Sequence, residues 1–182
     1  MMHKGMLWIS ALALAGTLAI AAPVNAQDNG TQGYTFSAGI FYPSKSAVRD
    51  ATSDTWFSVS LGYTFQTSEP TDTGYYYDLG VSVGYYGSDD LSNIPVQLTY
   101  TGYLNEQFFY RAGVGIGFAK EFRNLANPGA GTESSTGFVY SIEVGYNFNA
   151  GTTPVALTVG YVGQSGTGDQ HNGFTAMLSF RF

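Results

Sequence analysis

Residues 138–148 read FVYSIEVGYNF, and this stretch decides the fold. Large apolar side chains occupy every second position, while small or polar residues such as Ser141 and Glu143 stand between them. Strict alternation is typical of a β-strand with one apolar and one polar face. Within the apolar row the aromatic rings lie at the two ends, and the aliphatic Ile142 and Val144 lie in the middle.

Residues 75–85, YYYDLGVSVGY, repeat this sorting, with Tyr75 and Tyr77 at one end and Tyr85 at the other. A soluble core has no reason to sort rings from aliphatic side chains along a strand. In a membrane the rings favour the headgroup level and the aliphatic side chains favour hydrocarbon. The stretch is also about the ten residues that a tilted strand needs to cross a bilayer. The pattern therefore predicts membrane-spanning strands.

The same alternation recurs in eight segments separated by clusters of Gly, Asn, Asp, Pro and Ser. The expected strands are 34–42, 57–65, 75–85, 94–104, 108–118, 138–148, 155–161 and 174–182. An even number of strands lets the last pair with the first, which removes every open edge. We therefore predict an all-β fold, an eight-stranded antiparallel up-and-down transmembrane β-barrel, narrow enough to be filled by its own side chains.

The beginning of the chain has the features of a secretory signal. Lys4 precedes an apolar run over residues 7–22, and Val24-Asn25-Ala26 forms a cleavage motif of small residues. A permanent helical anchor is the alternative, but polar residues interrupt the run. We expect a signal peptide at 1–26, a short periplasmic N-terminal segment at 27–33 and the outer-membrane barrel at 34–182.

Composition limits the partners. The chain has seven basic and thirteen acidic residues, a formal net charge of −6, which argues against nucleic acid. We attribute the acidity to the solubility of polar loops rather than to a specific acidic surface. The sequence has no cysteine, so it can form neither a disulfide nor a lipid anchor on cysteine.

The connections predict the orientation. Those after the first, third, fifth and seventh strands are polar and mostly long, above all 121–136, whereas 105–106 and 149–153 are short. Short periplasmic turns and long outer loops would place both termini in the periplasm. Two links fit less well, because 66–73 is long for a periplasmic turn and 88–93 is short for an outer loop, but neither reverses the pattern.

At this point the chain resembles the small eight-stranded outer-membrane barrels, the group of the opacity-protein-like proteins, the Ail and OmpX adhesion barrels and the OmpA membrane domain. The resemblance spans residues 34–182 and assigns no subfamily. It is carried by Gly62-Tyr63-Thr64-Phe65, Gly145-Tyr146-Asn147-Phe148, Ile94-Pro95-Val96 and Phe180-Arg181-Phe182. It implies an outer-membrane location and an assembly signal for the barrel-assembly machinery, which matches Leu178, Phe180 and Phe182 by position.

Catalytic chemistry finds little support. His171 is the one histidine after the signal, and a lipid hydrolase would need a serine within its reach. The nearest upstream serine, Ser165, lies across a Gly-rich loop, and no His-x-Ser pattern exists. We expect no enzyme and no catalytic residue, with His171 solvated in an outer loop.

Other candidate sites also have simpler explanations. Asp89-Asp90 suits a turn better than a cation site, because two adjacent acids form an incomplete shell. The glycines Gly113, Gly115 and Gly117 lack the spacing of a phosphate loop and are explained as small inward positions. Trp56 is expected at the outer rim as a membrane anchor. We predict no metal site, no cofactor-binding residue and no cofactor.

Four ionisable residues fall on the inward parity, namely Asp78, Arg111, Glu143 and Arg181. Unpaired charges in a narrow lumen are costly, so the equal count of acids and bases predicts a compensated network. The alternative is that each charge sits in trapped water. Arg111 and Glu143 form the nearest expected pair, offset by about two residues along neighbouring strands.

Three functions remain open. The first is a non-enzymatic barrel with a filled lumen, acting structurally or through surface contacts of its outer loops. The second is a narrow conduit or binding barrel for small hydrophobic molecules, which the inward glycines favour slightly. The third is a lipid A-modifying enzyme. The expected partners are outer-membrane lipids, the barrel-assembly machinery and a host or envelope surface ligand, and we expect a monomer.

Overall fold

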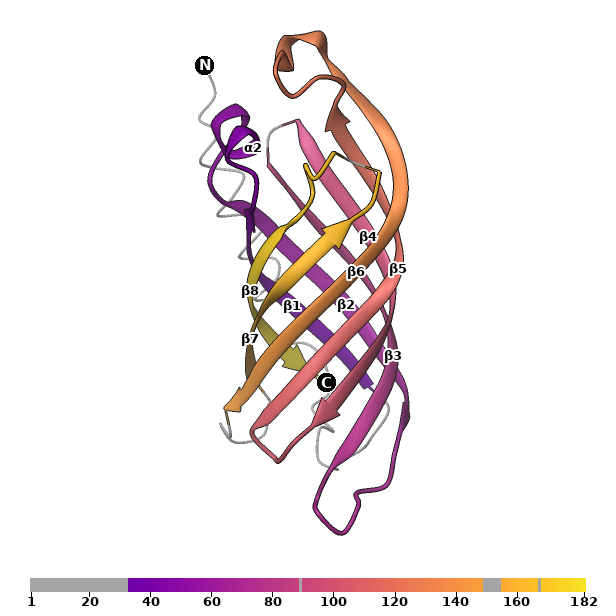
Figure 1. Cartoon of the computed structure of the whole chain (residues 1–182). Helices are drawn as coiled ribbons and strands as arrows, with labels where there is room; N and C mark the ends of the chain where they lie inside the picture. The colour runs from indigo at the N-terminus through magenta and orange to yellow at the C-terminus, as the bar shows by residue number, and fades with distance from the viewer. Residues whose placement is uncertain (1–32, 89, 149–154, 167) are drawn as a thin grey trace.

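The computed structural model describes residues 33–88, 90–148, 155–166 and 168–182, which form a closed barrel of eight antiparallel strands (Figure 1). The strands are β1 (Gly33–Pro43), β2 (Trp56–Thr67), β3 (Tyr76–Ser88), β4 (Leu91–Tyr103), β5 (Phe108–Phe122), β6 (Thr132–Phe148), β7 (Val155–Gln164) and β8 (Gly173–Arg181). Each strand pairs with its neighbours in sequence, and β1 closes the wall against β8. The predicted fold is confirmed. The expected signal peptide and residues 27–32 lie outside the described residues.

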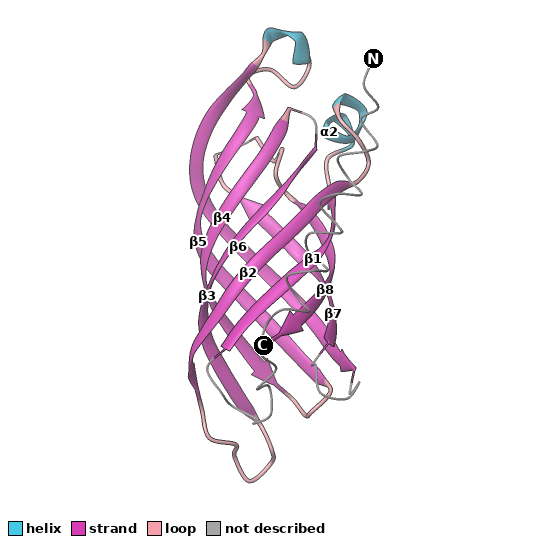
Figure 2. Ribbon diagram, turned by 180° about the vertical axis from the view of Figure 1, so that it is seen from behind, coloured by secondary structure: helices cyan, strands magenta, loops and turns pink. Residues whose placement is uncertain are grey.

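Two short helices lie in the connections. Helix α2 (Ser46–Ala51) follows β1, and the 3-10 turn η1 (Pro128–Ala130) joins β5 to β6. Both lie at the same end of the barrel, far from the C-terminus (Figures 1 and 2). We call this end the distal end, and we call the end that carries the C-terminus the proximal end. Among the described residues, none of the helices is long and apolar enough to span a bilayer.

The outer surface carries the alternating apolar rows. Its aliphatic side chains are exposed, with 60% for Leu98 and 62% for Ile142. Others of the same band are Ile40, Leu61, Val81, Val83, Val96, Val114, Ile116, Val144, Leu157, Val159 and Leu178. They come from all eight strands, so the apolar band surrounds the barrel. Soluble monomers rarely expose a continuous apolar surface of this size.

Aromatic rings border this band at both ends. Proximal ring pairs are Tyr34–Tyr63, Tyr77–Tyr100 and Phe108–Tyr146, with centroids 5.0–5.3 Å apart. Distal pairs are Tyr140–Tyr161 at 6.4 Å and Tyr161–Phe174 at 5.4 Å. The sorting seen along single strands in the sequence therefore forms two rings of aromatic side chains in three dimensions.

The connection predicted at 121–136 is mostly strand. Register pairs join Lys120 to Ser134 and Phe122 to Thr132, so β5 and β6 continue as a two-stranded hairpin beyond their neighbours. Only residues 123–131 form the connection itself. This hairpin rises at the distal end of the barrel (Figure 1). The polar Ser and Thr residues of the segment had hidden the strand pattern, because alternation is visible only where one face is apolar.

Candidate functional site: the barrel interior

The proximal part of the lumen holds a charge pair. Arg181 Nη1 lies 3.0 Å from Asp78 Oδ2, and the Asp78 carboxylate also accepts hydrogen bonds from Thr67 Oγ1 at 2.6 Å and Tyr103 Oη at 3.1 Å. Asp78 is 4% exposed. Three donors therefore satisfy this buried carboxylate, as a charge inside a narrow lumen requires. The rings of Tyr76 and Tyr103 stack beside the pair with centroids 4.4 Å apart.

Arg111 and Glu143 form the second pair. They stand directly opposite each other on β5 and β6, rather than about two residues apart as we had expected. Arg111 Nη1 is 3.4 Å from Glu143 Oε2, and Arg111 Nε donates to Thr101 Oγ1 at 3.2 Å. The structure thus brings the four predicted ionisable residues together as two pairs. Their contribution to stability remains a prediction.

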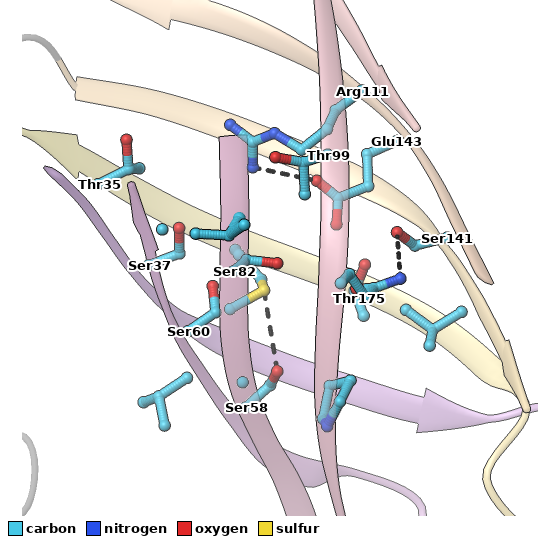
Figure 3. A pocket seen from close by; sticks show the side chains of 18 of the residues that line it. Thr35, Ser37, Ser58, Ser60, Ser82, Thr99, Arg111, Ser141, Glu143 and Thr175 are labelled. Carbon is cyan, nitrogen blue, oxygen red and sulfur yellow. Dashed lines mark hydrogen bonds and ion pairs between the residues drawn. The ribbon is translucent and has the colours of Figure 1, made fainter. Parts of the chain in front are cut away.

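A cavity of about 80 Å³ borders the Arg111–Glu143 pair, and serine and threonine hydroxyl groups form much of its polar lining. Figure 3 shows Arg111 and Glu143 at one side of it and serine and threonine side chains from several strands around it. The labelled hydroxyl residues are Thr35, Ser37, Ser58, Ser60, Ser82, Thr99, Ser141 and Thr175. A cavity needs roughly 10–15 Å³ of such volume to hold one water molecule, and ligand pockets span about 300–1,000 Å³. The cavity suits a few water molecules and is too small for a drug-sized ligand.

An aromatic cluster fills the lumen distal to the cavity. Phe41, Trp56 and Tyr86 are at most 3% exposed, and the Phe41 ring lies 4.3 Å from that of Tyr86 and 5.3 Å from that of Trp56. Leu91, Val139, Val162, Phe122 and Val48 of helix α2 complete the cluster. The expectation that Trp56 anchors the outer rim is wrong. Because Trp56 precedes the outward Phe57, strand alternation turns its ring inward.

His171 is also inside the barrel, so the expectation of a solvated histidine is wrong. Its exposure is 0%, and its ring lies 5.8 Å from Trp56 and 6.1 Å from Tyr86. Its Nε2 is 3.2 Å from the Lys120 carbonyl oxygen, which can only accept, so Nε2 carries the proton. Burial lowers the pKa of His171 to about 4, although this hydrogen bond opposes the shift.

His171 and Ser165 do not form a pair of catalytic base and nucleophile. The Ser165 hydroxyl accepts from the Phe138 backbone N–H at 3.0 Å, while the His171 ring is directed at a carbonyl. Asp90 lies 3.9 Å from the Lys120 ammonium, and Asp89 lies outside the described residues. Within the described ranges, no three potential metal-ligating side chains form a group.

Two buried amide side chains, Asn93 and Gln164, form a hydrogen-bonded group beside the aromatic cluster. Asn93 Nδ2 donates to Tyr86 Oη at 2.6 Å and to Gln164 Oε1 at 2.5 Å, while Gln164 Nε2 donates to the Gly117 carbonyl at 3.1 Å. A Cβ on Gly117 would overlap the Gln164 amide. Gly113 likewise makes room for the side chain of Gln97. These inward glycines of β5 therefore accommodate long polar side chains from β4 and β7 and do not widen a channel.

Sequence reasoning missed the distal cluster. The signal that could have found it is the inward parity of aromatic residues near the distal strand ends, where Phe41 lies between two outward residues and Tyr86 follows the outward Tyr85. Tyr103 and Phe109 show the same parity at the proximal end. His171 has no such signal, because it belongs to a connection without periodicity.

No known family profile and no curated protein matches the chain. Two similar solved structures are the N-terminal β-barrel domain of Pseudomonas aeruginosa OprF and the Yersinia pestis outer membrane protein Ail in a phospholipid bilayer nanodisc. Each is 13% identical and fully covered, over 85% and 84% of this chain, with TM-scores of 0.49 and 0.42. The closed eight-stranded topology of this chain confirms the resemblance to small barrels at the level of fold, with no subfamily assigned.

Proposed function

We propose that this chain is a non-enzymatic outer-membrane barrel that acts structurally or through surface contacts of its distal connections. The observation that carries the proposal is the band of exposed aliphatic side chains around a wall without open edges. Backbone groups inside a bilayer need internal partners, and a closed barrel supplies them. The aromatic rings at both borders of the band match the two membrane interfaces.

The proposed orientation places both termini in the periplasm. The distal end carries helix α2 and the protruding β5–β6 hairpin, while a connection of four residues, 104–107, joins β4 to β5 at the proximal end. Long outer and short periplasmic connections are usual in such barrels. Two connections depart from this rule, as the sequence had indicated. The proximal connection between β2 and β3 is long, and the distal connection between β3 and β4 has only two residues, 89–90.

Passage of molecules through the lumen has less support. The distal aromatic cluster and the proximal charge pairs both occupy the lumen, and the cavity between them is lined by polar and apolar groups alike. A conduit for hydrophobic molecules would need a wider apolar path. Enzymatic activity has less support still, because the His171 and Ser165 side chains bind backbone groups instead of each other.

Fractionation and mass analysis test the location. The protein should be recovered in the outer membrane with the intact mass of a chain that starts at Gln27, because the apolar run before Ala26 ends in a cleavage motif. Recovery in the inner membrane, or a mass that includes Met1, would refute this part of the proposal.

Cysteine labelling tests the orientation, since the natural chain has no cysteine to interfere. Gly129→Cys lies in η1 at the distal end, and Asp72→Cys lies in the proximal β2–β3 connection. In intact cells a membrane-impermeant maleimide should label only Gly129→Cys, and both should react after lysis. Labelling of Asp72→Cys alone in intact cells would invert the orientation.

Two measurements separate the functional alternatives. The purified protein in planar bilayers should show no steady conductance if both ends of the lumen remain filled. Lipid A mass spectra of cells with and without the protein should be identical if it is not an enzyme. Stable channels would favour the conduit, and a mass change in lipid A would favour the enzyme.

A further inference from the structure

The last residues of the β7–β8 connection fold into the distal opening of the lumen, which we call the distal mouth. Left-handed backbone angles at two residues direct the chain inward. Gly168 and Asp169 have φ angles of 54° and 64°, in the left-handed region. Asn172 Nδ2 donates to Asp169 Oδ1 at 2.8 Å, and Asn172 Oδ1 accepts from the Gln164 N–H at 2.7 Å. We call residues 168–172 the mouth segment. Its geometry directs Gln170 and His171 inward.

Polar contacts join the mouth segment to two other elements of the distal end. Gln170 Oε1 accepts from the Phe122 N–H at 3.0 Å and its Nε2 donates to the Phe122 carbonyl at 2.9 Å. Near helix α2, Lys45 Nζ donates to the Gly168 carbonyl, and the Ser44 N–H donates to the Asn172 carbonyl. The segment is therefore a closing element held by a small set of hydrogen bonds at its margins.

His171 is the residue by which this element enters the aromatic cluster. The Tyr86 hydroxyl donates to its backbone carbonyl at 3.0 Å, and the Trp56 and Tyr86 rings flank its imidazole. Among the described residues its Nδ1 is buried without a hydrogen-bond partner. A proton on Nδ1 would create a cation enclosed by apolar and aromatic groups, and such a charge is costly unless it is paired.

The charged groups of the neighbouring elements already have their own partners. From β5, Lys120 pairs with Asp90, and the buried Glu121 carboxylate lies 3.5 Å from Gln170 Nε2. Asp169 of the mouth segment is bonded to Asn172. Beside α2, Lys45 binds Gly168 O and Arg49 binds Pro43 O. The elements β1, β2 and β3 present Phe41, Trp56 and Tyr86, which carry no charge at neutral pH.

We propose that His171 makes the distal mouth acid-sensitive: protonation of its imidazole releases the mouth segment from the aromatic cluster and opens the distal end of the lumen. The closed state holds the ring neutral, with a pKa of about 4, whereas a released histidine has its ordinary pKa of about 6.5. Closure is thus fully stabilised above about pH 6.5 and weakens as the pH falls toward 4. The difference corresponds to an increase in the open fraction of up to about 300-fold.

The test measures the reactivity of a buried thiol, because its rate follows the open fraction even when that fraction is small. Val139→Cys places a thiol in the aromatic cluster, where Val139 is fully buried. Gly129→Cys provides an exposed reference that corrects for the pH dependence of the reagent, 4,4′-dithiodipyridine. In the full chain purified in detergent, the ratio of buried to exposed rates should rise more than tenfold between pH 7.5 and pH 4.5.

Two further substitutions in the Val139→Cys background assign the effect. His171→Gln keeps a neutral donor for the Lys120 carbonyl and should make the ratio independent of pH. Glu121→Gln removes the other buried ionisable group of the mouth and should leave the rise intact. Circular dichroism at each pH confirms that the barrel stays folded. A ratio that is constant with pH, or a rise that persists in His171→Gln, overturns the proposal.

Discussion

The Arg111–Glu143 pair gives the most direct test at the scale of single residues. Both side chains border the cavity, and Arg111 is 23% exposed and Glu143 13% exposed. Leaving one of the two charges unpaired should therefore destabilise the fold by somewhat less than the roughly 3–5 kcal/mol typical of fully buried pairs. We expect Arg111→Met and Glu143→Gln each to lower the free energy of unfolding in urea by about 2 kcal/mol. The double variant should recover much of this loss, because no charge is then left unpaired.

Arg123→Met is the matched control for this cycle. Arg123 also lies near a carboxylate, 3.9 Å from Glu133, but its side chain is 62% exposed, so the loss should stay within about 0.5 kcal/mol. If the double variant loses the full sum of the two single ones, Arg111 and Glu143 are not energetically coupled.

Asp78 should be more sensitive than Glu143. Its carboxylate accepts from Arg181, Tyr103 and Thr67, and its side chain is only 5% exposed. Asp78→Asn replaces one acceptor oxygen by a donor that faces other donors, and leaves Arg181 without its counter-charge. The urea midpoint of Asp78→Asn should therefore fall further than that of Glu143→Gln. A smaller shift would show that the proximal pair contributes less than its geometry suggests.

Sequence reasoning identified the charged residues but not their surroundings. Alternation alone places Asp78, Arg111, Glu143 and Arg181 on the inward face, because strand parity is a local property. Which acid meets which base depends on the register, and register is set by pairing across strands. The expected offset between Arg111 and Glu143 was wrong for this reason: the β5–β6 hairpin extends to Phe122 and Thr132, which the sequence did not reveal.

At the scale of elements, the contact between β1 and β8 leaves no room for a side chain at Gly39 of β1 or at Gly173 of β8, and Gly39 offers the test. A Cβ on Gly39 would overlap the Ala176 carbonyl and lie 2.7 Å from Met177 Cα, and backbone atoms cannot move aside as a flexible side chain can. Gly39→Ala should therefore force the first and last strands apart and destabilise the barrel by more than about 2 kcal/mol. The loss should be visible as a lower urea midpoint and as weaker protection of β8 amides from hydrogen exchange.

Gly62→Ala serves as the control for Gly39→Ala. Gly62 lies on β2, facing inward like Gly39, but the nearest atom to an added Cβ is 3.6 Å away, an ordinary contact. The Gly62→Ala variant should therefore have a stability close to that of the natural protein. Equal losses for the two variants would mean that glycine at inward positions matters in general, and that the closing contact has no special role.

Connections were harder to predict than strands. The eight strands follow from alternation, but Trp56 and His171 were both assigned to the outer surface and lie in the aromatic cluster. Trp56 could have been placed by extending the strand one residue. His171 could not, because its position depends on left-handed backbone at Gly168 and Asp169 and on hydrogen bonds with residues distant in sequence.

At the scale of the whole molecule, the C-terminal residue closes the barrel wall and also carries the predicted assembly signal. Phe182 follows β8 and exchanges two backbone hydrogen bonds with Tyr34, at 2.8 and 2.9 Å, while its ring lies 6.3 Å from the Tyr34 ring. The terminal residue is thus part of the wall. Its predicted role as an assembly signal, with Leu178 and Phe180, needs a substitution that leaves this pairing intact.

Phe182→Ala meets that condition, because alanine keeps both backbone hydrogen bonds and removes only the ring. The lost ring contact should lower the free energy of unfolding in detergent by about 1 kcal/mol. Phe148→Ala removes a ring from the end of β6, where Phe148 packs on Tyr146 at 5.3 Å, and should cost a similar amount. If the barrel-assembly machinery reads the terminal aromatic, the two variants will differ in cells despite equal stability: Phe182→Ala will accumulate unfolded in the periplasm, while Phe148→Ala will reach the outer membrane. Equal amounts of both variants in the outer membrane would assign Phe182 a purely structural role.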